Sequence, residues 1–491
     1  MKKRIFLKFV VLVFLLSCPG FLFALSNFNG NTEMWFRGGI DSHEPLAAAA
    51  LPSADTATQL KFDGALFFDG QIDFWKVASA KFSFSALGED IVPFGITKEK
   101  TTDVTGAVGQ DAQGNAVATV TKTNPVSFTL EEVSLTFHLR RDIWHWYISL
   151  FAGEFESPGT DVFLQKYFGA DPVSSVFMQR RIYQKGTPLY AIDGLGLGIA
   201  WRFGPPFAIS LYASVPADLN FLTNDTSRLA SIDLRFAGAF TKCIFDITAG
   251  GALPNAAAAA NVAAANPAAA PAPGFALNLG ASFLFGNPTA NSTLLQIGLR
   301  GWDPAATQTD ATGQTMPFDF DTIYFLLEPR FTGGTMNFSL ALFVLPKNSA
   351  VDNRKSSLSV FDNLLYIQGG SLNADGSAST GTSLGGGISG YKNIRMGNIT
   401  GKAGAMIAGG LMQHLSKVLV PDPAQPAQFS VRIAPFISAD LFNGIFNFML
   451  KVDIPNNVSV PTFTQPAGNP LAPQSDIVGS LKIQLSYLVR F

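Results

Sequence analysis

The residues of this chain that could do chemistry are charged side chains at every second position of apolar segments. Asp233 precedes Arg235 by two positions, and Glu328 precedes Arg330 by two. Positions two apart lie on one face of a β-strand, so the members of each pair share a face. Charges held on such a face attract or repel ions, and a ring of one sign selects the opposite ion. The predicted chemistry is therefore electrostatic selection of solutes.

The charged residues on the predicted polar faces lean towards positive charge. The basic positions are Lys81, Arg140, Arg202, Arg235, Arg330, Arg432, Lys451 and Lys482. The acidic positions are Glu132, Asp233, Asp246, Glu328 and Asp453. This imbalance predicts a pore with a weak preference for anions. Acid and base two apart on one face could instead neutralise each other, and that alternative stays open.

Signals for catalysis, metal binding and cofactor binding are weak. The histidines are His43, His138, His145 and His414, and no nucleophile motif surrounds them. The acidic residues between 303 and 321 do not have the spacing of an EF-hand loop. We therefore expect no enzymatic activity, no metal site and no cofactor. Nucleic-acid binding is not expected either, because the formal net charge is −2.

The elements that carry these charges are predicted to be β-strands of a membrane protein. Apolar and polar residues alternate over segments such as 195–203, 232–240 and 446–454. Charged residues make up only 14% of the chain, against roughly 25% in soluble domains. Past the N-terminus no apolar run approaches the roughly 20 residues of a spanning helix. In lipid only helices and closed barrels satisfy every backbone group, so the strands should close into a barrel.

The lengths of the connections predict an antiparallel up-and-down transmembrane β-barrel of about 18 strands. Short turns, such as 69–73, 141–142 and 204–206, alternate with long connections. The long connections are 41–57, 87–126, 156–192, 217–228, 252–273, 303–320, 346–382, 412–427 and 456–475. Nine long connections and eight short turns correspond to 18 strands with both termini on the short-turn side. The Gly-rich strand at 384–395 is the weakest, with 360–370 competing for its place, and 16 strands is the alternative.

The N-terminus has the pattern of a secretory signal peptide. Lys2, Lys3 and Arg4 precede an apolar run, and Ala24 supplies a small residue at the predicted cleavage site. Residues 1–24 are thus a signal peptide and 25–491 the barrel, with 255–273 an Ala/Pro-rich surface loop. Lipidation at Cys18 is the rival interpretation, although the proline that follows argues against it. We expect no plug domain before the barrel.

Aromatic residues cluster near the predicted strand ends. Trp75 and Trp144 follow short turns, and Trp201 and Phe203 precede one. Trp and Tyr prefer the headgroup level of a membrane, where the ring is in an apolar medium and the polar atom stays hydrated. The pattern predicts an aromatic girdle.

The last twelve residues, SLKIQLSYLVRF, form an amphipathic strand that ends on an aromatic residue. Tyr487, Val489 and Phe491 lie on its apolar face. This ending resembles the C-terminal signature of bacterial outer-membrane β-barrels, and the chain as a whole resembles porins. The resemblance implies an outer-membrane location with periplasmic termini, insertion by the barrel insertion machinery after delivery by periplasmic chaperones, and contact with outer-membrane lipid. It also implies passive diffusion of small hydrophilic solutes, with a homotrimer as one option.

The third long connection, 156–192, is unusually apolar for a loop. Val173, Val176 and Phe177 recur at helical spacing. In position it resembles the third loop of general porins, which folds inward and narrows the channel. That resemblance implies that Lys166, Arg180, Arg181 and Lys185 line a constriction. A loop that caps the mouth or packs against its neighbours is the alternative.

Two other functions remain open from the sequence. The apolar third loop supports the first alternative, a transporter of hydrophobic substrates that resembles the long-chain fatty-acid family. That family has an N-terminal hatch and an Asn-Pro-Ala start, and neither is recognisable here. A surface adhesin or structural barrel is the second alternative. The small and polar inner faces, together with the width of an 18-stranded barrel, favour the porin.

Overall fold

The computed structural model describes the strands and a few residues between them. The described residues are 33–43, 59–74, 77–88, 98–100, 109–110, 116–117, 121–123, 126–141, 144–156, 175–177, 190, 192–204, 206–215, 228–254, 275–287, 290–304, 308–309, 315–316, 318–346, 365, 383–397, 399–411, 415–419, 429–441, 444–456 and 481–490. The predicted signal peptide and the Ala/Pro-rich loop lie outside the described residues.

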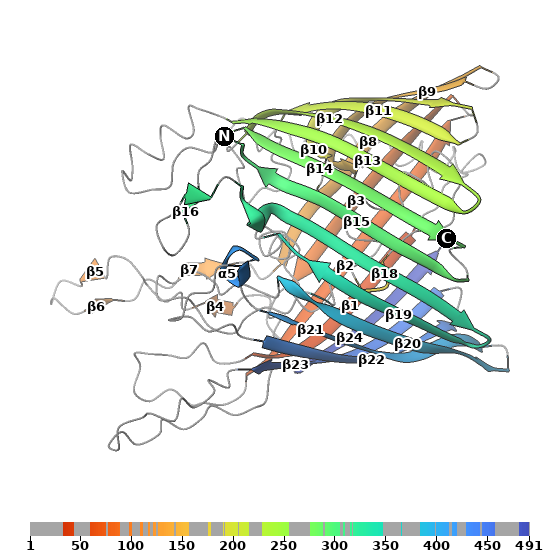
Figure 1. Cartoon of the computed structure of the whole chain (residues 1–491). Helices are drawn as coiled ribbons and strands as arrows, with labels where there is room; N and C mark the ends of the chain where they lie inside the picture. Colours follow the sequence, from red (N-terminus) through yellow and green to blue (C-terminus); the bar gives the residue numbers. More distant parts are fainter. Residues whose placement is uncertain are drawn as a thin grey trace, which may run out of the picture.

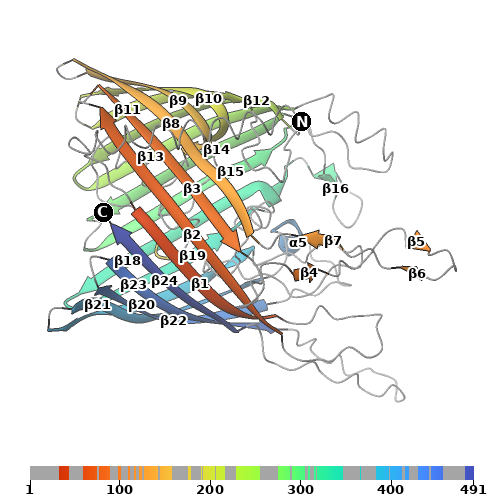
Figure 2. The same ribbon diagram turned by 180° about the vertical axis from the view of Figure 1, so that it is seen from behind.

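The described residues form one antiparallel sheet of 18 strands that closes on itself (Figures 1 and 2). Each strand pairs with the next along the ring, and the last strand pairs with the first, Trp35 opposite Leu488. The strands are β1 Glu33–His43, β2 Gln59–Phe74, β3 Ala78–Gly88, β8 Val126–Arg141, β9 Trp144–Glu156, β10 Ile192–Phe203, β11 Phe207–Val215, β12 Arg228–Phe240, β13 Cys243–Pro254, β14 Ala276–Gly286, β15 Ser292–Trp302, β18 Ile323–Gly333, β19 Met336–Val344, β20 Leu384–Met396, β21 Ile399–Leu411, β22 Phe429–Leu441, β23 Gly444–Asn456 and β24 Leu481–Arg490. The predicted up-and-down barrel of 18 strands is confirmed.

Short and long connections alternate around the ring, as the sequence predicts. All short connections gather at one end of the barrel, opposite the long ones (Figure 1). The Gly-rich segment at 384 is a strand, β20, so 18 strands and not 16 form the ring. The predicted turn at 69–73 is wrong, because β2 continues to Phe74 and Gln71 pairs with Lys81 on β3. Glu33 pairs with Arg490, so the first strand begins where the last one ends, at the short-turn end.

The barrel is apolar outside and polar inside. On β12, Ile232 and Leu234 are exposed, whereas Asp233 between them and Arg235 after them are buried. Most of the other strands repeat this pattern, which is the inverse of the pattern in a soluble protein. An outer face of exposed leucine, isoleucine and phenylalanine this extensive requires an apolar medium around it. The fold is therefore that of a transmembrane β-barrel. Among the described residues no helix is long and apolar enough to cross a membrane.

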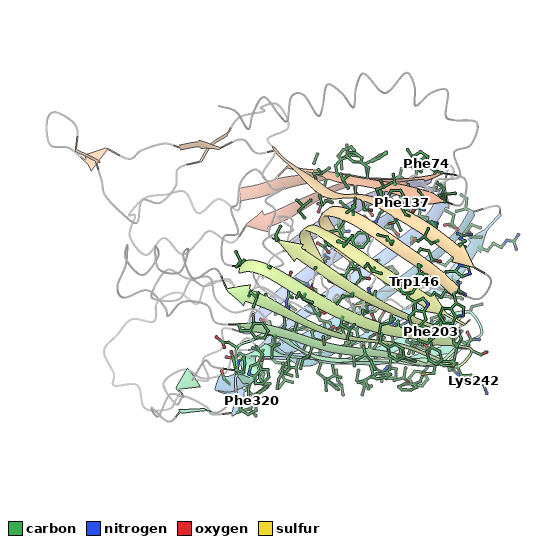
Figure 3. All side chains as sticks on the ribbon, turned by 90° about the horizontal axis from the view of Figure 1, so that it is seen from above. Phe74, Phe137, Trp146, Phe203, Lys242 and Phe320 are labelled. Carbon is green, nitrogen blue, oxygen red and sulfur yellow. The ribbon has the colours of Figure 1, made fainter. Side chains whose placement is uncertain are left out.

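An aromatic belt surrounds part of the short-turn end. Trp146 stacks on Trp201 with ring centroids 5.3 Å apart, and Trp201 contacts Phe203 at 4.7 Å. The belt continues through Phe207 to Phe245 on β13. Figure 3 shows Trp146 and Phe203 along the barrel end that carries the turn residue Lys242. The structure thus places aromatic rings at strand ends, where a girdle would lie.

Small elements lie at the long-connection end. They are β4 Lys98–Lys100, β5 Gly109–Gln110, β6 Ala116–Val117, β7 Thr121–Thr123, β16 Gln308–Thr309, β17 Thr315–Met316, the 3₁₀ helix η2 Phe320–Thr322 and the helix α5 Leu415–Leu419. The Ser416 backbone N–H and hydroxyl donate to the two carboxylate oxygens of Asp321, at 2.8 and 2.7 Å. This contact ties the connection before β18 to the one before β22.

Candidate functional site

The inward face of the barrel carries ion pairs between neighbouring strands. Arg432 on β22 donates from Nε and Nη2 to the two oxygens of Asp453 on β23, at 2.5 and 2.7 Å. Lys81 on β3 lies 2.7 Å from Glu132 on β8. Arg330 on β18 donates to Glu328 two positions earlier, at 2.8 Å. These bridges reduce the positive field of the wall, which supports the alternative of neutralised pairs.

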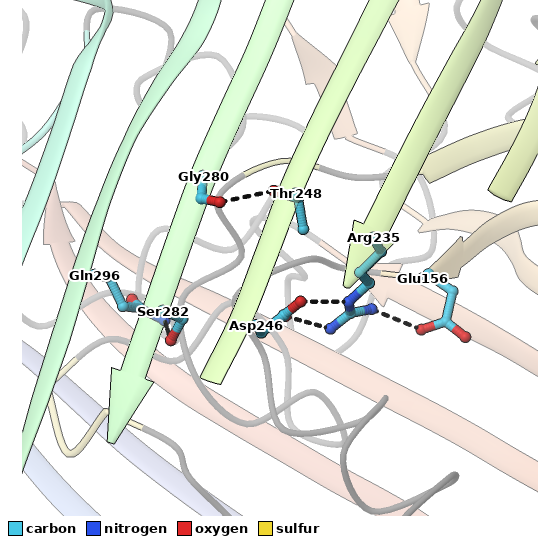
Figure 4. Close-up of polar contacts among 7 residues, drawn as sticks. All are labelled: Glu156, Arg235, Asp246, Thr248, Gly280, Ser282 and Gln296. Carbon is cyan, nitrogen blue, oxygen red and sulfur yellow. Dashed lines mark hydrogen bonds and ion pairs between the residues drawn. The ribbon is translucent and has the colours of Figure 1, made fainter. Parts of the chain in front are cut away.

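Arg235 is the centre of the most deeply buried of these clusters (Figure 4). Its Nε and Nη2 donate to the two carboxylate oxygens of Asp246 on β13, at 2.8 and 2.6 Å. Its Nη1 donates to Oε2 of Glu156 on β9, at 3.1 Å. The guanidinium is inaccessible to solvent. We call Arg235, Asp246 and Glu156 the Arg235 cluster. The sequence suggested Asp233 as a partner of Arg235, and the structure shows hydrogen bonds from Arg235 to Asp246 and Glu156.

The polar inner wall continues from this cluster across β13 to β18. The Thr248 hydroxyl donates to the Gly280 carbonyl at 3.4 Å, and Gln296 donates to Ser282 at 3.2 Å (Figure 4). The Tyr324 hydroxyl donates to the Gln296 side-chain oxygen at 2.9 Å. Neutral polar groups thus satisfy one another along the wall, as buried polar groups must.

The ends of β9 and β10 leave the wall together. The ladder between β8 and β9 ends at Gly153, and the ladder between β10 and β11 ends at Leu195. Beyond these points Glu154 and Glu156 pair only with Asp193 and Ile192. We call residues 154–156 and 192–193 the inward ribbon.

Two glycines that face each other permit the bend. Gly153 and Gly194 are register partners, with φ of 96° and 112°. These values lie in the region that side chains other than glycine rarely adopt. A Cβ on Gly153 would also overlap the backbone oxygen of Glu131. The sequence therefore marks the bend by two glycines, although only the register shows that they are opposite each other.

The inward ribbon folds back towards the middle of the barrel. The β9 residue in the same register row as Arg235 is Tyr147, through Ala200 and Ser210. Glu156 lies nine positions beyond Tyr147, about 30 Å along a straight strand. A hydrogen bond between Glu156 and Arg235 thus requires the ribbon to fold back into the barrel.

Aromatic rings cover the inner wall below the bend. Phe151 stacks on Phe155 with centroids 4.5 Å apart, and Phe155 meets Tyr212 edge-on at 6.0 Å. The rings of Phe155 and Tyr212 lie against Gly198 on β10. Gly196 and Gly198 are positions over which neighbouring rings lie, because a Cβ there would meet the ring of Phe151 at Gly196 and the ring of Tyr212 at Gly198.

The chain between β9 and β10 also touches the opposite side of the ring. Ser175 donates from its hydroxyl to Oε2 of Glu328 at 2.5 Å, and the Val176 N–H donates to Oε1 at 3.0 Å. Phe177, fully buried, lies against Gly387 on β20, where a Cβ would come within 3.0 Å of its ring. β20 is nine strands from β9 in a ring of 18, so these residues lie on the far wall.

Tyr190 returns the chain to the first wall. Its hydroxyl oxygen lies 3.1 Å from where a Cβ on Gly250 of β13 would be. Burial raises the pKa of the Tyr190 hydroxyl well above its ordinary value, and the nearby Asp233 carboxylate adds to the effect. Tyr190 therefore stays neutral. Residues 175–177 and 190 together show that this connection contacts both walls from within.

Most inward-facing residues are buried. Gln484 and Ser486, which share the inward parity of β24, are 7% and 5% exposed. The inner wall is therefore covered at these positions.

The predicted site residues fall into four groups. Those in the wall whose side chains are buried or ion-paired are Asp233, Arg235, Glu328, Arg330, Arg432 and Lys451. Arg140 and Arg202 lie on the inward face near the short-turn end, where both face His145 in register. Lys166, Arg180, Arg181 and Lys185 lie outside the described residues, as does Phe491. Val489 pairs with Gly444, and the Tyr487 hydroxyl donates to the Leu441 carbonyl at 3.0 Å.

Residues for catalysis or metal binding are not gathered at this site. No group of three His, Cys, Asp or Glu that could hold a metal ion occurs among the described residues. His138 forms a hydrogen bond of 3.1 Å with Ser79 and an edge contact with Tyr147. Ser79 is buried in the wall, so we interpret this contact as packing. The site is suited to holding a segment of chain and to screening charge.

Comparisons with known proteins give only distant structural likeness. No family model matches the chain, and no curated protein matches it. Among solved structures, OccAB3 of Acinetobacter baumannii is 7% identical, with 94% of this chain and 99% of that chain covered and a TM-score of 0.44. OprB of Pseudomonas putida is 8% identical, with 95% of each chain covered and a TM-score of 0.39. The Escherichia coli outer-membrane protein Wzi, described as a carbohydrate-binding β-barrel, is 10% identical, with 97% and 87% covered and a TM-score of 0.40. Values this low support no inference about the function of this chain.

Proposed function

We propose that this chain is an outer-membrane porin that admits small hydrophilic solutes by passive diffusion. The observation that carries the proposal is a closed ring of 18 strands with an apolar outer face and charged residues on its inner face. A closed barrel is the β-structure that satisfies its backbone in lipid, and its polar interior gives solutes a path. The short-turn end, which holds the start of β1 and the end of β24, would face the periplasm.

The channel in this proposal is narrow at the level of the inward ribbon. Support comes from the Arg235 cluster on one wall and the Ser175–Glu328 contact on the other. The basic residues Lys166, Arg180, Arg181 and Lys185 belong to the same connection and would line or overhang the constriction. Contacts to both walls favour this arrangement over a loop that only caps the mouth.

Charge selectivity is the finer part of the proposal. A weak anion preference follows from the excess of basic wall residues. Ion pairs at Lys81, Arg235, Arg330 and Arg432 limit its size. Insertion guided by Tyr487, Val489 and Phe491, delivery by periplasmic chaperones and assembly as a homotrimer belong to the same proposal.

Transport of substrates with apolar parts is the second candidate function. The observation that favours it is the inward cluster of Phe151, Phe155 and Tyr212. Aromatic rings inside a barrel provide an apolar surface to a passing ligand. The rings are buried in this structure, so such a substrate would first have to displace the inward ribbon.

Recordings across a planar lipid bilayer test the porin proposal. The mature protein should produce discrete ohmic conductance steps, and a salt gradient should give a reversal potential near zero or slightly on the anion side. A clear cation preference would contradict the anion preference alone. Absence of steps, with protein shown to be inserted, would contradict the porin and leave the second candidate.

A further inference from the structure

We propose that Glu156 and Arg235 set the aperture of the channel by holding the inward ribbon against the β12–β13 wall. This inference rests on the proposed porin function and adds a positioning pair to it. Neither residue needs to touch the solute. Their part is to decide how much of the lumen the ribbon occupies.

The geometry of Arg235 allows it to hold the ribbon against the wall. An arginine has five N–H donors in a rigid fork, and a carboxylate binds two of them side by side. Asp246 takes Nε and Nη2, which fixes the guanidinium plane on the wall. Nη1 then points at Glu156 on the ribbon. Asp246 thus orients Arg235, and Arg235 holds the ribbon.

The ribbon leaves the ladder of the wall before it reaches Arg235. Its pairing with β8 and β11 stops at the glycine pair, and the register partners of residues 154–156 are residues 192–193. Phe155 packs on Phe151 and Tyr212. The charge-assisted hydrogen bond from Arg235 joins Glu156 to the β12–β13 wall. Its loss should raise the population of undocked ribbon about tenfold or more.

The test compares Glu156→Gln with the unchanged protein. The substitution removes one charge, keeps the side-chain shape and leaves the bidentate Arg235–Asp246 pair in place. Glu156→Asp keeps the charge and should retain part of the contact. The matched control is Asp321→Asn, which makes the same change from carboxylate to amide at a buried residue that joins two other connections through Ser416 and is not one of the wall residues. Heat-dependent migration in detergent gels verifies that each variant is a folded barrel.

Two readouts are needed. In bilayers, Glu156→Gln should show openings of larger conductance about ten times as often as the unchanged protein, and vesicles should admit larger sugars. In detergent, trypsin should cleave after Lys166, Arg180, Arg181 or Lys185 about ten times faster, because cleavage follows the population of the open form. Asp321→Asn should change neither readout.

The outcomes separate this inference from the porin proposal. Faster cleavage in Glu156→Gln without conductance in any variant would support the positioning pair and contradict the porin. Conductance in all variants, with openings and cleavage unchanged by Glu156→Gln, would overturn the positioning pair and leave the porin intact. An equal effect of Asp321→Asn would also overturn it, because the response would then reflect general loosening of the connections.

Discussion

Glu328 shows how much one inward side chain can do in this barrel. It is fully buried on β18 and accepts hydrogen bonds from Arg330, from the Ser175 hydroxyl and from the Val176 N–H. Its carboxylate thus joins a wall arginine to a segment that enters from the other side of the ring. A buried carboxylate is tolerated only with such partners.

Removal of the Ser175 hydroxyl tests the worth of this contact. Ser175→Ala should lower the free energy of unfolding by about 1.5–3 kcal/mol, the range for hydrogen bonds to charged groups. Glu328→Gln should cost more, because Arg330 also loses its partner. Urea titration of the vesicle-inserted protein measures both. In the double variant, the loss of unfolding free energy should be smaller than the sum of the two single losses. Strict additivity would mean that Ser175 and Glu328 do not interact.

The β9–β10 pair is the element that departs from a regular barrel. Both strands follow the wall up to Gly153 and Gly194 and then bend inward, with left-handed φ at both positions. The bend brings Glu156 to Arg235 and lets residues 175–177 reach β18 and β20. Two glycines in one register row therefore decide whether this connection lies inside the ring or outside it.

Gly194→Ala should weaken the bend. An alanine at φ of 112° is strained by about 1–3 kcal/mol, whereas a straight strand would relieve the strain. We expect larger openings in bilayer recordings, together with faster proteolysis between residues 156 and 192. Gly333→Ala is the control, because a Cβ there meets nothing within 4 Å and its φ is not left-handed. Unchanged openings in Gly194→Ala would show that the glycine pair is not the hinge.

The whole molecule has two different ends. One carries the short turns, the aromatic belt and the paired termini of β1 and β24. The other carries the long connections, with η2 and α5 joined through Asp321 and Ser416. In the proposed orientation the short turns face the periplasm and the long connections face the outside of the cell.

Thiol labelling tests this orientation. In a Cys243→Ser background, Lys242→Cys places a thiol on an exposed short turn, and Leu419→Cys places one on α5, where the leucine is 54% exposed. A membrane-impermeant reagent should label Leu419→Cys on intact cells. It should reach Lys242→Cys only after the outer membrane is opened. Labelling in the reverse order would invert the proposed orientation.

Much of the barrel was predictable from local pattern. Period-two alternation in segments such as 232–240 reports which face of a strand meets lipid, and this needs no tertiary information. The length of each connection indicates at which end of the barrel it lies. The count of nine long connections and eight short turns then predicts 18 strands. The pattern failed at 69–73, where Asp69, Gly70 and Asp73 look like a turn. There the strand continues, because Asp69 points inward to Ser83 and Lys81.

The sequence by itself determined the class of fold, the inward parity of the charged residues and the unusual character of the third long connection. The tertiary structure decided the partners. Arg235 meets Asp246 and Glu156 on other strands, and Ser175 meets a glutamate 153 positions further along. The physical reason is that alternation along a strand is a local property of the backbone. Which side chains meet across the lumen depends on register, on closure of the ring and on one bend at a pair of glycines, and the local sequence does not show which positions the register brings opposite each other.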